Sequence, residues 1–244
     1  MPVPIRTRIL IADDHELIAR GIERVLENDF DVVGVVANGR DLLSEALRLQ
    51  PNVIVLDIAM PVLNGIEAAV RLRSTLPDVK LVFITQHIDR QYVQAVFRAG
   101  GHAYVVKQTA ATEVREALTA VLKGRFYVSP VLAKDLPTLN ELCENPGEFF
   151  SGGMTPRERE VLQLVAEGKT GKEIAESLGI STKTVEFHKR GISEALGLRT
   201  TAELTRYALE HGIIAPRPSD LAPGSPNHAG AGEDKAWPFG NNRS

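Results

Sequence analysis

Five short runs rich in Val and Ile, separated by amphipathic stretches, constrain the fold of this chain more than any other feature. Each run is apolar at nearly every position, as in strands that are buried on both faces of a parallel sheet. Between the runs, apolar residues recur at spacings of three and four, which is typical of helices. The alternation predicts a doubly wound α/β domain with a five-stranded parallel sheet. The runs are residues 8–12, 31–36, 53–57, 80–85 and 103–107.

The second half of the chain, residues 154–214, has a helical pattern only. Three segments carry a Glu three residues after a Thr, which is the capping-box signature of a helix start. A fourth helix is expected after Gly179-Ile180, with Ser181 or Thr182 as its cap. We therefore predict a small all-α domain of four helices. The three capping boxes are Thr155–Glu158, Thr170–Glu173 and Thr200–Glu203.

The remaining segments read as connections. We expect the first domain to span residues 6–125, followed by a linker over 126–153 with one short helix near Leu132. Residues 215–244 are rich in Pro, Gly, Ala, Asn and Ser, and we predict a disordered tail because the apolar content is too low to offset the ordering entropy. Trp237 and Phe239 leave open a short docking motif in that tail, although a solvated tail is favoured.

Bulk composition excludes several classes of protein. The single cysteine, Cys143, rules out an internal disulfide and a cysteine-cluster metal site. No apolar run reaches the roughly 18–20 residues that span a bilayer, and the N-terminus lacks the apolar region of a signal peptide. We therefore expect a cytoplasmic protein with no membrane partner. The net charge is −3, so any nucleic-acid surface must be a local patch.

Polar side chains follow the predicted strands where each strand ends. The carboxyl ends of parallel strands meet at one edge of the sheet, so these groups should lie together. Clustered carboxylates repel one another, and a hard cation such as Mg²⁺ would compensate. A carboxylate can also act as a nucleophile and form an aspartyl-phosphate, which a nearby cation and hydroxyl would stabilise. The alternative is structural, with Asp14 only capping the next helix. The residues are Asp13, Asp14, Asp57, Thr85 and Lys107.

The first half resembles the receiver domain of two-component response regulators. The resemblance rests on the segments Ile11-Ala-Asp-Asp-His15, Leu56-Asp-Ile-Ala-Met-Pro61, Phe83-Ile-Thr85 and Tyr104-Val-Val-Lys107. It implies a flavodoxin-like sheet with strand order 2-1-3-4-5.

The same resemblance implies roles for individual residues. Asp57 would accept phosphate from a sensor histidine kinase, and Lys107 would contact the phosphoryl group. Thr85 and Tyr104 would form the switch pair, in which the hydroxyl moves to the phosphate and the ring turns inward. Mg²⁺ would be held by Asp13, Asp14, Asp57 and the carbonyl of Ala59.

This sequence departs from the usual receiver pattern at a few positions outside the expected pocket. Asn64 stands where Asp is frequent, and Gln108 and the pair Gly101-His102 are also unusual. We expect these departures to affect the partner surface or the switching rate, not the chemistry. A further hypothesis is that Ala59 and His87 set the rate of dephosphorylation by controlling access for water; an unchanged phosphate half-life after their replacement would refute it.

The second half resembles the helix-turn-helix domain of LuxR/NarL-type regulators. The carrying segments are Met154–Leu162, Lys172–Ala175 and Ser181–His188, and Thr170-Gly171 departs from the usual pattern. Two short helices joined at Gly179 would place the second one in the major groove. By resemblance, Glu186, Phe187 and Arg190 face the bases, and Lys172, Lys183, Thr184 and Lys189 suit phosphate contacts.

Each of these helix positions has a structural alternative. An apolar stripe of Val185, Ile192, Leu196 and Ala195 is expected to pack inside, Phe187 could be a core aromatic, and His188 suits a structural role better than a metal ligand. By resemblance, the last helix, over Thr200–Glu210 with Leu204, Tyr207, Ala208 and Leu209, would mediate dimerisation on DNA.

The sequence therefore predicts a non-enzymatic transcription factor. Phosphorylation of Asp57 would switch binding to double-stranded DNA, with a homodimer as the phosphorylated or DNA-bound form. Two alternatives stay open. One is a receiver-containing interaction module that does not bind DNA, and the other is a magnesium-dependent phosphohydrolase, against which no further general acid or substrate cap is visible.

Overall fold

The computed structural model describes residues 6–133, 154–211 and 213–214. The predictions for Cys143, for the linker beyond residue 133 and for the tail from residue 215 lie outside these residues. The strands are β1 (Arg8–Ala12), β2 (Asp31–Val36), β3 (Val53–Leu56), β4 (Lys80–Thr85), β5 (Ala103–Val106) and β6 (Tyr127–Val128).

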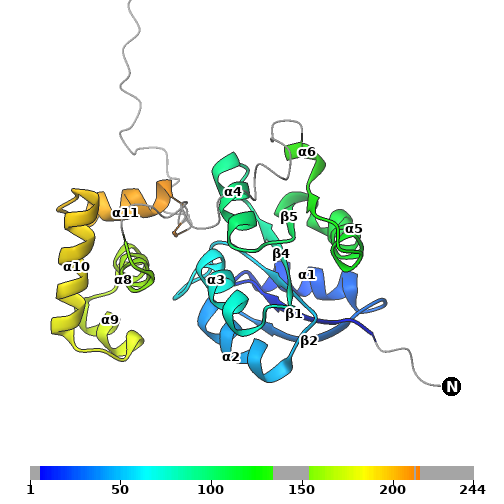
Figure 1. Ribbon diagram of the computed structural model, residues 1–244, viewed down its shortest axis with the longest axis horizontal. Helices are drawn as coiled ribbons and strands as arrows, with labels where there is room; N and C mark the ends of the chain where they lie inside the picture. The colour runs from blue at the N-terminus through cyan, green and yellow to red at the C-terminus, as the bar shows by residue number, and fades with distance from the viewer. Residues whose placement is uncertain (1–5, 134–153, 212, 215–244) are drawn as a thin grey trace, which may run out of the picture.

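The helices of the first domain alternate with its strands (Figure 1). They are α1 (Glu16–Leu26), α2 (Gly39–Leu49), α3 (Gly65–Thr75), α4 (Arg90–Arg98), the short 3-10 turn η1 (Lys107–Thr109), α5 (Ala110–Leu122) and α6 (Pro130–Ala133). The second domain contains α8 (Pro156–Ala166), α9 (Gly171–Leu178), α10 (Thr182–Leu196) and α11 (Thr201–Glu210).

The strands form one parallel sheet in the order β2-β1-β3-β4-β5-β6. The first five strands confirm the predicted order. The sixth is a correction to the predicted count, because Tyr127 and Val128 pair with Ala103 and Tyr104 and so extend the sheet into the predicted linker. A two-residue strand is too short to show any periodicity, which is why the sequence pattern missed it. The short helix expected near Leu132 is present as α6.

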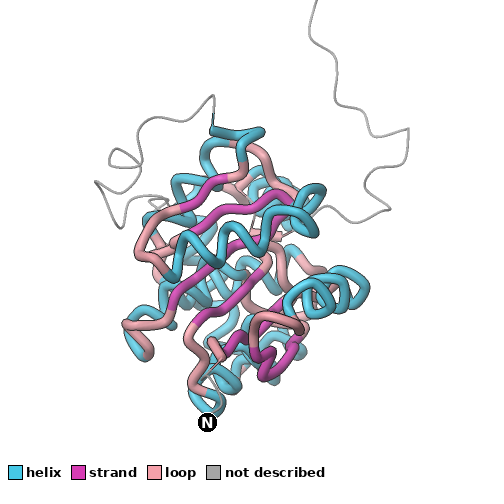
Figure 2. The backbone as a smooth tube through the Cα atoms, turned by 90° about the vertical axis from the view of Figure 1, so that its right-hand side faces the viewer, coloured by secondary structure: helices cyan, strands magenta, loops and turns pink. Residues whose placement is uncertain are grey.

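Helices cover both faces of the sheet. On one face, α1 and α5 pack against strand residues such as Ile11 and Val105. On the other face, α2, α3 and α4 pack against residues such as Leu56 and Phe83. Figure 2 shows the strands side by side with helices in front of and behind them. Because both faces are covered, the strands carry apolar residues at successive positions instead of alternating ones.

The second domain follows the predicted caps. Thr155, Thr170 and Thr200 each accept a hydrogen bond from the backbone of the Glu three residues later and complete a capping box. Ser181 caps α10. Gly179 ends α9 with φ of 63°, a left-handed conformation that makes the tight turn between the two helices. The four helices share one apolar core, and no helix in the described part of the chain is long and apolar enough to cross a membrane.

Candidate functional site

The polar strand ends meet at one edge of the sheet, as predicted. The backbone N–H of Asp57 donates to the Ala12 carbonyl (2.9 Å), and that of Asp13 donates to the Val36 carbonyl (3.0 Å). These bonds continue the ladder past the strands and hold both carboxylates at the edge. Both residues are only 3% exposed, so their charges need compensation within the protein.

Lys107 supplies that compensation from the end of β5. Its Nζ lies 2.6 Å from Asp57 Oδ2 and 2.8 Å from Asp13 Oδ2, and its side chain is 4% exposed. Burial raises the pKa of Asp57; the charge of Lys107 lowers it, the charge of Asp13 raises it again, and the net direction is upward. For Lys107, burial lowers the pKa, but the charge of Asp57 and the bonds to both carboxylates outweigh it, so that pKa is raised.

The site also contains His15, to which the sequence reasoning gave no role. Its ring Nδ1 lies 2.8 Å from Asp14 Oδ1 and 3.2 Å from Asp13 Oδ1, and its backbone N–H donates to Asp13 Oδ1 (2.8 Å). Ligand atoms of Asp13, Asp14, His15 and Asp57 all lie within 4.8 Å of one another. Three carboxylates in this arrangement are the hard oxygen donors that a divalent cation prefers, so the set fits a metal ion.

Thr85 and Tyr104 are both fully buried beside this pocket. Thr85 pairs in register with Val106, the residue before Lys107, and its Oγ1 accepts from the His87 N–H (3.3 Å). The Tyr104 hydroxyl donates to the His87 carbonyl (2.8 Å), so the ring lies in the inward position. His87 itself stacks on Tyr92, with ring centroids 4.1 Å apart. Thr85 and Tyr104, the predicted switch pair, are therefore both hydrogen-bonded to the backbone of His87.

Residues 57–65, which we call the acceptor loop, connect Asp57 to the start of α3. Ala59, whose carbonyl was predicted to be a metal ligand, lies in this loop two residues after Asp57. The Gly65 N–H donates to the Ile58 carbonyl (2.8 Å) and closes the loop. Asn64 caps α3, because its side chain accepts from the Glu67 N–H (2.9 Å). An Asn therefore fulfils the capping role at the position where Asp is more frequent.

Replacing Gly65 with alanine is expected to destabilise the protein by about 1–3 kcal/mol or more, the cost of overpacking. A Cβ atom at Gly65 would lie 2.0 Å from the carbonyl oxygen of Asp57, which is backbone and has little room to move. The matched control is Gly21→Ala in α1, where nothing lies within 4 Å of the added atom and a gain of about 0.5–1 kcal/mol is expected. Urea denaturation measures both, and equal stability of the two variants would contradict the packing argument.

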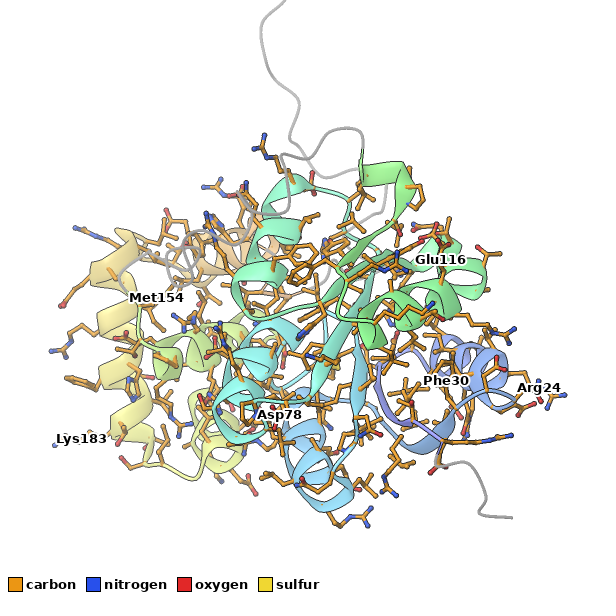
Figure 3. The ribbon with its side chains drawn as sticks, turned by 45° about the vertical axis from the view of Figure 1, so that its right-hand side comes forward. Arg24, Phe30, Asp78, Glu116, Met154 and Lys183 are labelled. Carbon is orange, nitrogen blue, oxygen red and sulfur yellow. The ribbon has the colours of Figure 1, made fainter. Side chains whose placement is uncertain are left out.

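Most of the predicted DNA-contacting residues are exposed on α9 and α10 of the second domain. Lys172 is exposed in the first turn of α9. On α10, Lys183, Glu186, Phe187 and Arg190 are exposed, and Thr184 and Lys189 are half-buried. Lys189 pairs with Glu186 (3.4 Å), and Lys183 lies on the side of the domain away from the sheet (Figure 3).

The structure decides between the alternatives for this helix. Phe187 is 70% exposed and is not a core aromatic. Val185 and Ile192 are buried and Leu196 packs partly, but Ala195 is exposed, so its place in the apolar stripe was wrong. At 3.6 residues per turn, Ala195 lies at the margin of the stripe formed by Val185, Ile192 and Leu196, so its side chain can stay exposed.

The last helix packs mainly within its own domain. Leu204 and Ala208 are buried in the core, whereas Tyr207 and Leu209 pack only partly against it. Dimerisation through α11 therefore stays a prediction that would use its partly buried side chains.

His188 lies on α10, where its ring meets Phe187 edge-on, with centroids 5.7 Å apart.

A buried aspartate beside a lysine at the edge of a parallel sheet, followed by a helix-turn-helix, defines the class of two-domain signalling regulators. Residues 9–119 match the response regulator receiver domain, and residues 153–208 match the bacterial regulatory proteins of the luxR family. The chain belongs to the response regulators that join a receiver domain to a LuxR-type DNA-binding domain.

Individual relatives align with this chain over nearly their full length. The transcriptional regulatory protein MctR of Rhizobium johnstonii is 35% identical over 212 residues, covering 86% of this chain and 96% of that protein. The oxygen regulatory protein NreC of Staphylococcus carnosus is 33% identical over 216 residues, with 85% and 99% covered. The structure of RcsB from Salmonella enterica serovar Typhimurium, bound to a promoter with a phosphomimetic, is 26% identical with a TM-score of 0.53, covering 86% of this chain and all of that one.

Proposed function

We propose that a sensor histidine kinase phosphorylates Asp57 and that this modification controls sequence-specific binding to double-stranded DNA, and hence transcription. The observation that carries the proposal is the buried Asp57 carboxylate, held 2.6 Å from the Lys107 ammonium in the same chain as an exposed recognition helix. We assign the DNA-binding domain to residues 154–214. The receiver domain, predicted over residues 6–125, is extended to residue 128 because β6 pairs with β5 of its sheet.

The transfer needs a nucleophile and a nearby cation, and the position of the buried Asp57 carboxylate beside the Lys107 ammonium supports these two roles. An Asp57 oxygen attacks the phosphorus of a phosphohistidine, a P–O bond forms, the P–N bond breaks, and the departing imidazole takes up a proton from solvent. Asp13, Asp14, Asp57 and the Ala59 carbonyl would hold Mg²⁺, which supplies neutralisation of the phosphoryl charge. Lys107 would then contact the phosphoryl oxygens, and Thr85 would donate its hydroxyl to them while Tyr104 packs behind.

Incubation with acetyl phosphate and Mg²⁺ tests this function directly. We expect one stable phosphate per chain by mass spectrometry, and tighter binding of sequences selected from random duplexes when the phosphodonor is present. Continued turnover of acetyl phosphate would support a phosphohydrolase instead. Phosphorylation without salt-sensitive binding to any duplex would support the alternative of an interaction module that does not use DNA.

Two single substitutions on the second domain should distinguish contacts to DNA bases from contacts to the DNA phosphates. Arg190→Ala is expected to lose about 1–3 kcal/mol of discrimination at one base pair, because a bidentate pair with guanine is lost. Lys172→Ala should weaken all sequences alike and reduce the salt slope by about 1. Binding assays on the selected site and on single-base variants measure both. A uniform loss for Arg190→Ala would reassign it to phosphate.

Dimerisation on DNA gives the proposal a further geometric consequence. If α11 pairs two chains through its partly buried residues, Tyr207 and Leu209, the selected sequences should contain two half-sites about 10–10.5 bp apart or a multiple of that spacing.

A further inference from the structure

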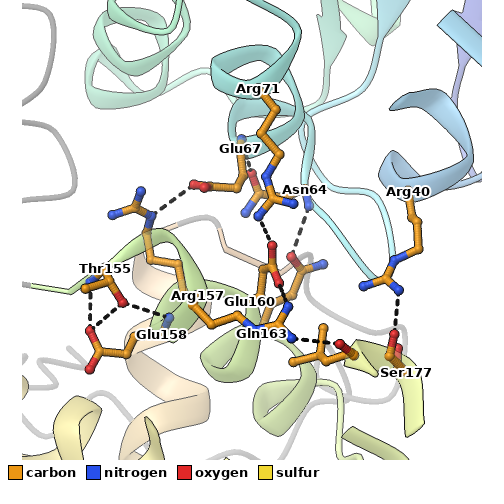
Figure 4. Close-up of polar contacts among 12 residues, drawn as sticks. Arg40, Asn64, Glu67, Arg71, Thr155, Arg157, Glu158, Glu160, Gln163 and Ser177 are labelled. Atoms are coloured by element: carbon orange, nitrogen blue, oxygen red, sulfur yellow. Dashed lines mark hydrogen bonds and ion pairs between the residues drawn. The ribbon is translucent and has the colours of Figure 1, made fainter. Parts of the chain in front are cut away.

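The DNA-binding domain contacts the receiver domain along α8, its first helix (Figure 4). Arg159 Nε lies 2.9 Å from Glu67 Oε2 of α3, and Glu160 pairs with Arg71 of the same helix. Glu67 and Glu160 are both almost fully buried. The contact therefore includes α3 and α8, and Arg40 of α2 also donates to the Ser177 carbonyl of α9 (Figure 4). The helix α10 lies on the far side of α8 from the sheet (Figure 1).

The deepest part of this contact is made by Gln163, which is 1% exposed although it is polar. Its Nε2 donates to the Met60 carbonyl (2.9 Å), and its Oε1 accepts from the Asn64 N–H (3.0 Å). The neighbouring Glu167 accepts from the Val62 N–H (3.2 Å) and from Gln163 Nε2 (2.8 Å). One side of α8 thus binds three backbone groups of the acceptor loop.

These three groups follow Asp57 by three to seven positions in the same closed loop. Val62 has φ of 71°, a left-handed conformation that β-branched residues rarely adopt. At the end next to α3, the Gly65 N–H donates to the Ile58 carbonyl and Gly65 packs closely against the Asp57 backbone, so the two ends of the loop are held together. The backbone groups that Gln163 and Glu167 hold therefore belong to the same short, hydrogen-bonded loop as Asp57 and Ala59.

We propose that Gln163 is a positioning residue for the phosphorylation pocket, through which the DNA-binding domain restrains the acceptor loop. The proposal rests on the proposed function of Asp57. We call the chain closed when α8 contacts the acceptor loop in this way. In the closed chain, Val62 is kept in its strained conformation, and backbone groups of Met60 and Asn64 are bonded to Gln163. The acceptor loop therefore changes its conformation less readily when a phosphoryl-like group enters the pocket. Regulation then acts on the loop instead of hiding the recognition helix, whose Phe187 is exposed in this closed arrangement.

The coupling must be reciprocal. If release of α8 helps the pocket bind a phosphoryl-like group, then binding of that group must favour release of α8 by the same factor. This gives two independent measurements of one quantity, and a residue with a purely structural role would lower stability without moving either of them.

The test uses full-length protein and beryllofluoride with Mg²⁺ as the probe. Gln163→Met keeps the length of the side chain and removes both hydrogen bonds to the loop. We expect it to bind the probe about fivefold more tightly or better by calorimetry, since allosteric couplings are typically about 5–150-fold. Small-angle scattering of the wild type should show expansion when the probe binds. Gln50→Met, the same change at an exposed receiver position, should leave the affinity unchanged.

Each outcome decides the proposal. Unchanged or weaker probe binding by a folded Gln163→Met would overturn it, as would probe binding that does not expand the wild type. If Gln163→Met does not fold, Glu167→Met, at the half-exposed end of α8, should show a smaller shift in the same direction, and no shift would again overturn the proposal. Failure of the wild type itself to bind the probe would instead count against the function proposed for Asp57.

Discussion

Replacing Asp57 with asparagine is expected to abolish phosphate incorporation and, with it, the whole gain in DNA affinity that a phosphodonor produces. The amide lacks the carboxylate nucleophile, so no P–O bond can form. Couplings of this kind usually amount to about 5–150-fold, and the ratio of affinities with and without donor should therefore fall to one. Asn is close to Asp in size, so the buried position should stay packed.

Mass spectrometry after treatment with acetyl phosphate and a binding titration on the selected duplex measure this prediction. Asp78→Asn is the matched control, since Asp78 is exposed and lies outside the pocket; this variant should behave like the wild type. Phosphate-dependent DNA binding that persists in Asp57→Asn would place the acceptor elsewhere.

Replacing Lys107 with methionine is expected to destabilise the protein by about 3–5 kcal/mol near neutral pH, the usual cost of removing one partner from a buried ion pair. The Met side chain fills most of the space but leaves Asp13 and Asp57 facing each other without a cation. In the wild type, one Lys107 ammonium contacts both carboxylates. Chemical denaturation at pH 7 measures the loss.

The loss should shrink as the pH falls. Burial already raises the pKa of Asp57, and removing Lys107 takes away the group that opposes this rise. An acid with a raised folded-state pKa is penalised while ionised, so the penalty is complete above the folded pKa. It fades as the pH falls and is gone below the ordinary value of about 3.9. Stability relative to wild type should therefore recover as the pH falls from 7 towards 4.

Lys123→Met is the control for the loss of a positive charge, because Lys123 is exposed at the end of α5. Its stability should differ from wild type by only a few tenths of a kcal/mol, as for most surface substitutions. A pH-independent loss in Lys107→Met would show that packing, and not charge, explains the effect.

Local sequence patterns were sufficient for the first five strands, for the helices of the second domain and for the main charged groups of the pocket. The clustering of Asp13, Asp57 and Lys107 follows from apolar runs that end in polar residues, because parallel strands present their ends to one edge. The strand order was implied by the resemblance to receiver domains. The helix starts of the second domain followed from capping boxes, since a Thr and a Glu three residues apart satisfy each other's backbone. These interactions are short in sequence or fixed by topology.

The contacts between the domains were beyond the reach of such patterns. Gln163 and Glu160 occupy helix positions that look solvent-exposed in sequence, and Met60 and Asn64 lie 103 and 99 positions away from Gln163. The position of His15 in the pocket was likewise seen only in the structure, where its ring lies beside the Asp14 carboxylate.

By itself, the sequence determined that this chain is a receiver joined to a helix-turn-helix, with Asp57 at the end of a central strand. Periodicity, helix caps and the short motifs that resemble receiver and LuxR-type domains encode these features over a few residues. Only the tertiary structure decided that Lys107 contacts both carboxylates, that β6 extends the sheet and that Gln163 binds the acceptor loop. The reason is that these contacts depend on how distant surfaces fit together, and no local pattern records such a fit.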